Sequence, residues 1–189
     1  MRTEFVGPAV GEELRDQSGV ALLIALGLMM IYVSVRFVWR LSLGAVIALI
    51  HDAIIVVGFF ALTGYTFDLT VLAAVLAVIG YSINDTIVVG DRIRENFRNV
   101  RKGTPAEVIN GAITQTLSRT IMTGVSTLLA VVALLLLGGE ALFGFSIALL
   151  VGVGFGIYSS VYVAGALMLY LGVSRDDFIV KMEEVDERP

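Results

Sequence analysis

The sequence predicts an all-α protein, a polytopic bundle of helices that cross a membrane. Of its 189 residues, 57% are hydrophobic, and the mean hydropathy is +0.90. A soluble domain of this size cannot hide that much apolar surface in one core. The apolar residues also fall into five runs, each near the roughly 20 residues that a helix needs to cross the hydrocarbon core of a bilayer.

The charged and turn residues between these runs delimit the spans. The first span has no charge and ends before Arg36, Trp39 and Arg40, which form a cationic and aromatic edge. The turn at 64–68 is too short for anything but a hairpin between antiparallel helices. The apolar stretch after Glu140 is longer than one span requires, so it includes a loop, a tilt or an interfacial piece. The predicted spans are residues 18–35, 41–63, 69–90, 119–139 and 145–171 of a transmembrane domain at 18–174.

Lysine and arginine set the orientation of the bundle. They concentrate in the turn after the first span and in the loop 91–118, whereas the opposite hairpins carry only Asp68 and Glu140. The positive-inside rule therefore places this loop and the C-terminal tail, residues 175–189, in the cytoplasm, with residues 1–17 on the other side. Five spans with an external N-terminus and no signal peptide are unusual, so we expect a fragment of a longer protein.

The cytoplasmic loop itself carries helical signals. Residues 91–102 place Ile93, Phe97 and Val100 on one helical face, which predicts an interfacial amphipathic helix or an extension of the third span. The run Thr104-Pro105-Ala106-Glu107 is a capping box with proline at the first helical position. We expect the helix that it opens to lead toward Arg119.

Asp85 and Arg119 are the first candidates for function, because a charged side chain at membrane depth usually faces a protein interior or a water-filled path. Asp85 lies on the third span, with Tyr81, Ser82 and Asn84 as polar neighbours. Arg119 opens the fourth span, followed by Thr123 at helical spacing. Antiparallel spans joined on the cytoplasmic side bring Asp85 and Arg119 to similar depth. Such a pair is suited to carrying a proton. The alternative is a static ion pair that joins two helices.

Asp52, in the second span, shares a helical face with the small residues Gly44 and Ala48, so we expect it to point into the bundle. Its carboxyl is either part of a proton relay or a protonated group that hydrogen-bonds a neighbouring helix. The adjacent His51 points about 100° away around the helix and is read as a packing residue. The spacing of Gly152 and Gly156 indicates close helix packing.

Several classes of function find no support. The chain has no cysteine and one histidine, so we predict no metal site and no cofactor. Its few basic residues lie at predicted membrane borders, which gives no support for nucleic-acid binding. An intramembrane aspartyl protease needs carboxylates that share a proton. Asp85 follows asparagine rather than glycine, and Arg119 would disturb a shared proton, so we predict no enzyme activity.

The run Gly80-Tyr81-Ser82-Ile83-Asn84-Asp85-Thr86, followed by Asp91-Arg92-Ile93-Arg94-Glu95-Asn96, closely resembles the fourth-span region of the SecF family. The resemblance extends over nearly the whole chain. It is carried by Phe5-Val6-Gly7-Pro8, Arg36-Phe37, Trp39-Arg40, His51-Asp52, Leu117-Ser118-Arg119-Thr120 and Phe143-Gly144-Phe145-Ser146.

The resemblance implies a protein-export subunit of the bacterial inner membrane, related to resistance-nodulation-division transporters. The five helices would be spans two to six of a six-helix set, without the first span and most of the first periplasmic domain. The family works with SecD to use the proton-motive force in moving preproteins out of the SecYEG channel. Its proton-coupling aspartate falls on Asp85 and its partner arginine on Arg119. The alternatives are a passive assembly subunit for SecD and, more distantly, a lipid or drug exporter.

Overall fold

The computed structural model describes residues 8–100 and 102–178, with side chains from residue 19 onward. Residues 1–7 of the expected periplasmic tail lie outside the described residues, and so does most of the motif Phe5-Val6-Gly7-Pro8. Residues 179–189 of the expected cytoplasmic tail also lie outside them. The described part consists of helices and short turns and contains no strand. Five of its helices are long and apolar enough to cross a membrane, which confirms the predicted fold class.

The long helices follow one another through short turns. They are α1 (Pro8–Arg36), α2 (Trp39–Thr63), α3 (Leu69–Asn99), α4 (Pro105–Leu137) and α5 (Glu140–Tyr158). The last span continues from α5 through a π-helical turn (Ser159–Val163) into α6 (Ala164–Tyr170), and a 3-10 helix (Arg175–Asp177) follows.

Local chemistry explains where these helices begin and end. Gly64 ends α2 in the left-handed conformation, with φ of 71°, and Asp68 caps α3 by accepting a hydrogen bond from the amide of Val71 at 2.9 Å. At the start of α4, the amide of Glu107 donates to Thr104 Oγ1, and the Glu107 carboxylate accepts from the amide of Thr104. The predicted capping box is therefore confirmed.

The basic segment between the third and fourth spans does not form a separate interfacial helix. Helix α3 runs without a break to Asn99, so of the two alternatives the structure shows an extension of the third span. Helix α4 likewise continues from Pro105 through Arg119 to Leu137. A helix of the length of α3 measures about 46 Å, whereas the hydrocarbon core is about 30 Å thick. Both helices are therefore longer than an untilted crossing of the hydrocarbon core requires.

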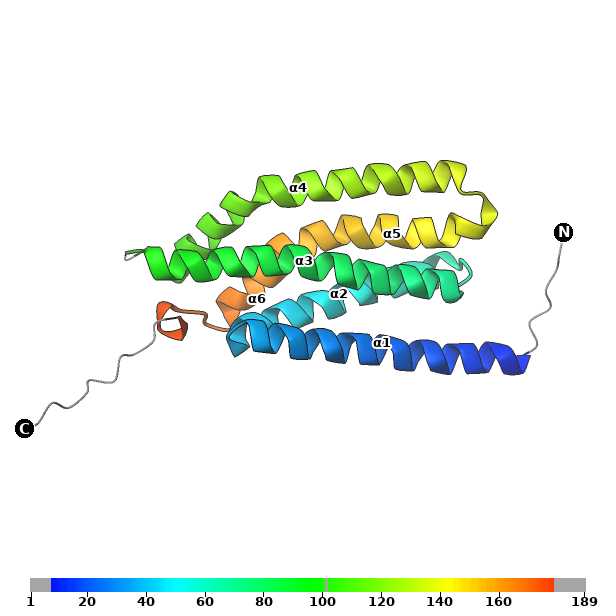
Figure 1. Cartoon of the computed structure of the whole chain (residues 1–189), viewed down its shortest axis with the longest axis horizontal. Helices are drawn as coiled ribbons and strands as arrows, with labels where there is room; N and C mark the ends of the chain where they lie inside the picture. The colour runs from blue at the N-terminus through cyan, green and yellow to red at the C-terminus, as the bar shows by residue number, and fades with distance from the viewer. Residues whose placement is uncertain (1–7, 101, 179–189) are drawn as a thin grey trace, which may run out of the picture.

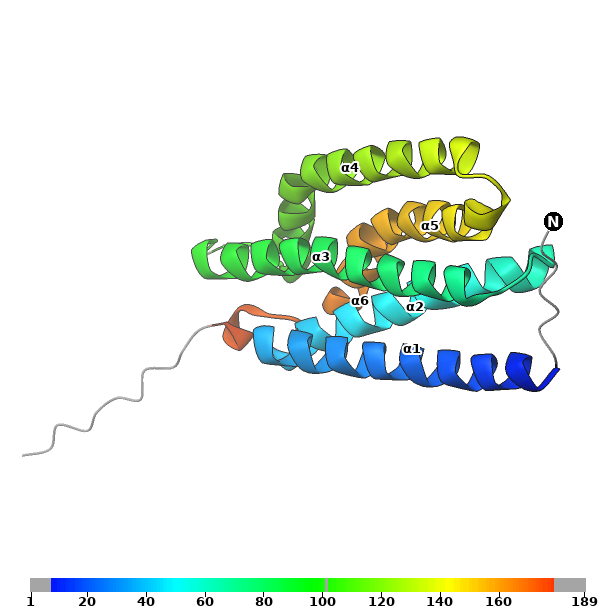
Figure 2. The same ribbon diagram turned by 45° about the vertical axis from the view of Figure 1, so that its right-hand side comes forward.

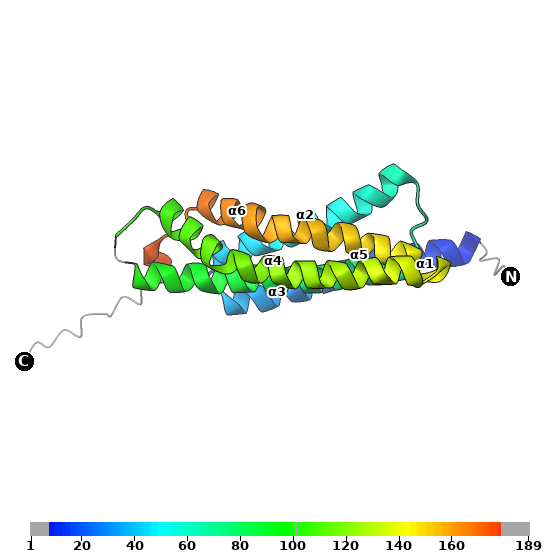
Figure 3. The same ribbon diagram turned by 90° about the horizontal axis from the view of Figure 1, so that it is seen from above.

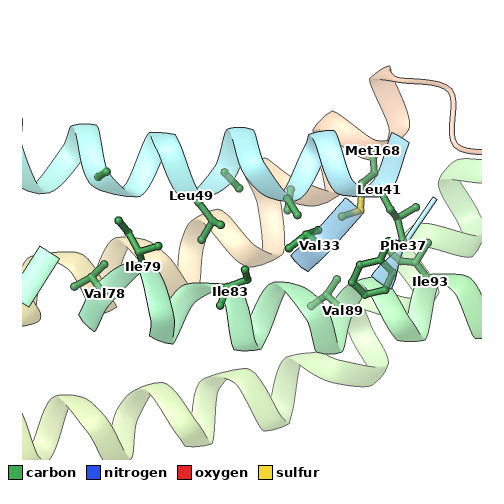
Figure 4. Close-up of a cluster of buried hydrophobic side chains, with 14 of the residues drawn as sticks. Val33, Phe37, Leu41, Leu49, Val78, Ile79, Ile83, Val89, Ile93 and Met168 are labelled. Carbon is green, nitrogen blue, oxygen red and sulfur yellow. The ribbon is translucent and has the colours of Figure 1, made fainter. Parts of the chain in front are cut away.

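Helix α3 lies at the centre of the bundle, between α2 and α4, and it also packs along α5 (Figures 1 and 2). Viewed from above, α4 runs over α3 and α5 lies beside it (Figure 3). Helices α1 and α2 lie on the side of α3 away from α4 (Figure 1). Buried aliphatic side chains fill the space between α2 and α3, among them Leu49, Ile79 and Ile83 (Figure 4). Many large apolar side chains of α1 and α4 face outward, as lipid contact requires.

Glycines allow α5 to approach its neighbours closely. A Cβ atom at Gly152 would overlap the side chain of Val78 on α3. A Cβ atom at Gly156 would lie 3.6 Å from Ser82 Cβ, also on α3. The predicted role of the glycine pair in helix packing is therefore confirmed, with α3 as the partner helix.

Candidate functional site

Asp52 lies at the centre of a buried polar cluster. Its side chain is 0% exposed, which confirms that it points into the bundle. Ser82 Oγ on α3 donates a hydrogen bond to Asp52 Oδ2 at 2.5 Å, and His51 Nδ1 lies 3.2 Å from Asp52 Oδ1. The side chain of Ser159 interacts with the same carboxyl. Both carboxyl oxygens of Asp52 thus have partners within the protein.

The π-helical turn extends this cluster toward the middle of α3. Its two serines, Ser159 and Ser160, are 0% exposed. Ser160 Oγ lies 3.2 Å from Thr86 Oγ1 and 3.4 Å from the carbonyl oxygen of Ser82. A π-turn inserts one residue into the helical repeat, so it rotates side chains out of ordinary α-helical register. Here the turn brings two consecutive serines against α3, which is why the cluster joins α2, α3 and the last span.

Asp85 has a different environment on another face of α3. It is 3% exposed, and its Oδ2 atom is buried without a hydrogen-bond partner among the described residues. Tyr81 contacts α4 near Gly124, where an added Cβ atom would lie 3.7 Å from the tyrosine hydroxyl. Moving four residues along each antiparallel helix places Asp85 opposite Thr120. The Tyr81 hydroxyl and Thr120 Oγ1 are also buried without partners in the described part.

Arg119 interacts with Asp85 through space. The guanidinium is close enough to act electrostatically on the carboxyl, but no ion pair within 4.0 Å joins the two side chains in the described structure. Arg119 is exposed, whereas its neighbour Thr120 is 0% exposed. The structure therefore brings the two predicted residues together without a direct contact.

A cleft of about 340 Å³ between α3 and α4 reaches Arg119 but is not lined by Asp85. It is lined by Val88, Asp91, Arg92 and Glu95 of α3, and by Gln115, Thr116 and Arg119 of α4. Val88 lies one helical turn beyond Asp85. Because most of the lining groups are polar or charged, water can reach Arg119 and the edge of the Asp85 site.

The other predicted polar residues are not brought to Asp85. Asn84 is exposed on α3. Thr123 Oγ1 donates to the backbone of its own helix, to the carbonyl oxygens of Arg119 at 3.0 Å and Thr120 at 3.1 Å. The hydroxyls of Ser126 and Thr127 also bond to carbonyl groups of α4. The hydroxyl row on α4 is therefore satisfied locally rather than by the Asp85 carboxyl.

Three participants escaped the sequence reasoning: Thr120, Ser159 and Ser160. Thr120 directly follows Arg119, but only the helix rotation shows that it faces inward. The two serines depend on the π-turn, which has no clear sequence signal. Among the described residues, no group of three or more His, Asp or Glu side chains is arranged to hold a metal ion.

Five apolar helices that enclose two carboxyl groups define a polytopic membrane protein with polar sites inside the bundle. Residues 1–174 match the family described as protein export membrane protein SecD/SecF, C-terminal. The chain belongs to this family. It is 57% identical to the protein translocase subunit SecF of Pseudomonas aeruginosa over 100% of this chain and 62% of that protein. It is 53% identical to SecF of Vibrio alginolyticus over 100% of this chain and 61% of that protein.

A solved structure has the same fold. The crystal structure of SecDF from Thermus thermophilus, described as a translocon-associated membrane protein, superposes with a TM-score of 0.83 at 49% identity. The alignment covers 87% of this chain and 23% of SecDF. The chain thus spans about 62% of the length of the Pseudomonas relative and a smaller part of the fused SecDF protein.

Proposed function

We propose that this chain is the membrane part of a SecF-type subunit that acts with SecD in protein export from the bacterial cytoplasm. In this proposal the bundle lies in the inner membrane, with the α1–α2 turn, the α3–α4 turn and the C-terminus in the cytoplasm. The family assignment supports the export role, and the single-chain SecDF relative supports the partnership with SecD. The SecYEG channel and preproteins are the further partners. The role is transport rather than enzymatic catalysis.

We further propose that Asp85 carries the proton that couples export to the proton-motive force. The supporting observation is its buried Oδ2 atom, which has no hydrogen-bond partner in the described structure although polar groups of α3 and α4 lie nearby. A buried carboxyl without partners favours its neutral form, whereas an approaching guanidinium favours the ionised form. Movement of Arg119 toward Asp85 would therefore release a proton from the carboxyl, and movement away from it would let the carboxyl bind one.

The cleft between α3 and α4 gives this proton a route to the cytoplasmic side. Arg119 lines the cleft and also acts on Asp85, so it lies between water and the carboxyl. Thr120 and Tyr81 present hydroxyls on the same interface, where they are suited to hold water or to bond the carboxyl when α4 shifts. Asn84 and Thr123, which point elsewhere or bond locally, have no direct part in this mechanism.

A passive role in assembling SecD is the second candidate. The Asp52 cluster favours it, because its hydrogen bonds join α2, α3 and the last span and need no titration. The two candidates differ in what they require of Asp85. A passive subunit tolerates Asp85→Asn, since asparagine keeps the volume of aspartate, whereas a proton carrier does not, since asparagine cannot titrate.

The test is proton-gradient-dependent export in membrane vesicles that contain the full-length parent protein with SecD. We expect Asp85→Asn to reduce export to the rate seen without a gradient, and Arg119→Lys to cause a partial loss, because lysine keeps the charge but not the planar fork. Asp176→Asn removes an exposed carboxylate outside the site and serves as control. Copurification with SecD confirms assembly. Full gradient dependence in assembled Asp85→Asn would leave only the passive role.

A further inference from the structure

A second cavity, of about 290 Å³, lies where the α1–α2 turn, the last turns of α3 and the 3-10 helix meet. These segments share one end of the bundle (Figure 1). Three arginines line the cavity: Arg36, Arg94 and Arg98. Phe37 and Phe178 contribute apolar surface. The cavity therefore combines concentrated positive charge with an apolar wall.

The charges around this cavity do not cancel. Arg36 donates two hydrogen bonds to Asp91, at 2.7 and 2.8 Å. Asp177 also lines the cavity, but it is paired with Arg40 at 3.0 Å. Arg94 and Arg98 have neither a hydrogen bond nor an ion pair with any described residue. Among the described residues, both nearby carboxylates are thus engaged with other arginines, which leaves the guanidinium groups of Arg94 and Arg98 available to an anion.

The cavity also lies at the depth of lipid headgroups. About 20 residues of α3, counted from Leu69, cross the hydrocarbon, which puts Arg94 about 9 Å and Arg98 about 15 Å beyond its edge along the helix. Side chains of an α-helix tilt toward its N-terminus, so both arginines reach back toward the membrane. Trp39 begins α2 at the same end and is 63% exposed, and tryptophan is enriched at membrane interfaces.

We propose that this cavity binds the phosphate headgroup of an anionic phospholipid from the surrounding bilayer. Arg94 and Arg98 would hold the phosphate through charge-assisted hydrogen bonds, in the manner of guanidinium–phosphate pairs generally. Phe37 and Phe178, which are 8% and 6% exposed, would form the apolar floor of the site beneath the headgroup. Phe178 is held in place by stacking on Phe97 of α3, with ring centroids 5.5 Å apart. This site is separate from Asp85 and does not depend on the proposed proton pathway.

The test uses the full-length subunit assembled with SecD in nanodiscs that contain equal amounts of phosphatidylglycerol and phosphatidylcholine. Native mass spectrometry then measures which lipid the complex retains. We expect preferential retention of phosphatidylglycerol. Arg94→Gln should lower this preference about tenfold and Arg94→Gln/Arg98→Gln about a hundredfold, because each replaced arginine loses a charge-assisted hydrogen bond to the phosphate. The variant Arg94→Lys/Arg98→Lys keeps the charges and retains most of the preference.

Lys102→Gln is the matched control, because it removes one exposed positive charge from the neighbouring turn without altering the cavity. It is expected to retain phosphatidylglycerol as the native protein does. Equal retention of both lipids by the native complex would overturn the proposal, and so would equal losses in Lys102→Gln and Arg94→Gln. Displacement of the lipid by millimolar inorganic phosphate would also overturn it, because it would identify a site for the free anion.

Discussion

Asp52 and Asp85 are both aspartates buried in membrane-spanning helices, yet they differ in their hydrogen-bond partners. Asp52 is bonded by Ser82 and lies beside His51 and Ser159, so both of its oxygens are satisfied. Asp85 retains a buried oxygen without a partner in the described structure, beside a water-accessible cleft. In lipid, a polar group without an internal partner is costly. We infer that the Asp52 carboxyl stabilises helix packing and that the Asp85 carboxyl binds and releases a proton.

The largest contrast is expected in export. Asp85→Asn should abolish the gradient-dependent part of export, whereas Asp52→Asn should preserve it, because asparagine still accepts a hydrogen bond from Ser82. The measurement compares both variants in the same vesicles, at matched amounts of SecD complex. Loss of gradient dependence in both would mean that the two carboxyls act in one proton path.

The next contrast concerns packing beside the Asp52 cluster. Gly152→Ala forces a methyl group into Val78 and should lower the free energy of unfolding by about 1–3 kcal/mol, the usual effect of overpacking. Gly154, two residues away, has no atom within 4 Å of an added Cβ. Gly154→Ala should therefore leave stability within about 0.5 kcal/mol of the native value or raise it slightly. Titration with sodium dodecyl sulfate in mixed micelles measures both, and equal effects would refute the close packing of α5 on α3.

A smaller contrast separates two buried threonines. Thr86 bonds Ser160 in the Asp52 cluster, so Thr86→Val should cost about 1 kcal/mol of stability. The Thr120 hydroxyl has no partner in the described part, so Thr120→Val should cost little or be stabilising. The same micelle titration reports stability. If Thr120 holds water near Asp85, its valine variant should also slow export, whereas Thr86→Val should not.

An effect of similar size, and one that depends on pH, is expected at Asp68, a carboxyl in the hairpin outside the spans. Burial alone would raise its pKa, but hydrogen bonds from the Thr70 hydroxyl and the Val71 amide outweigh burial and hold the pKa below its ordinary value. Stability from this cap is complete above the ordinary pKa and is lost as the pH falls through the lowered one.

Asp68→Ala should therefore cost about 0.5–2 kcal/mol at neutral pH, as loss of a helix N-cap does. The difference from the native protein should shrink in acid. Thermal unfolding between pH 3 and 7 is the measurement, with Asp176→Asn as an exposed carboxylate control. A difference that stays constant with pH would show that the carboxylate is not the stabilising group.

The local patterns of the sequence were sufficient for the class of fold. The five apolar helices, the short hairpin and the Thr104 capping box depend on neighbouring residues alone, and each appears in the structure. The inward direction of Asp52 also followed from the small residues on its helical face. The continuous run of α3 to Asn99 was only one of two open alternatives, because an amphipathic segment fits either a new helix or the end of an old one.

The sequence by itself determined that there are five apolar helices and that two of them carry a carboxyl within their apolar run. The reason is that each side chain contributes its own free energy of transfer from water to lipid. Only the tertiary structure decided which carboxyl is satisfied. The partners of Asp52 come from α3 and a π-helical turn distant in the chain, and helix rotation turns Asn84 and Thr123 away from Asp85 while Tyr81 and Thr120 face inward. Whether two groups form a hydrogen bond depends on differences of a few tenths of an ångström in the distance between them, and no pattern along one helix specifies the distance to another helix.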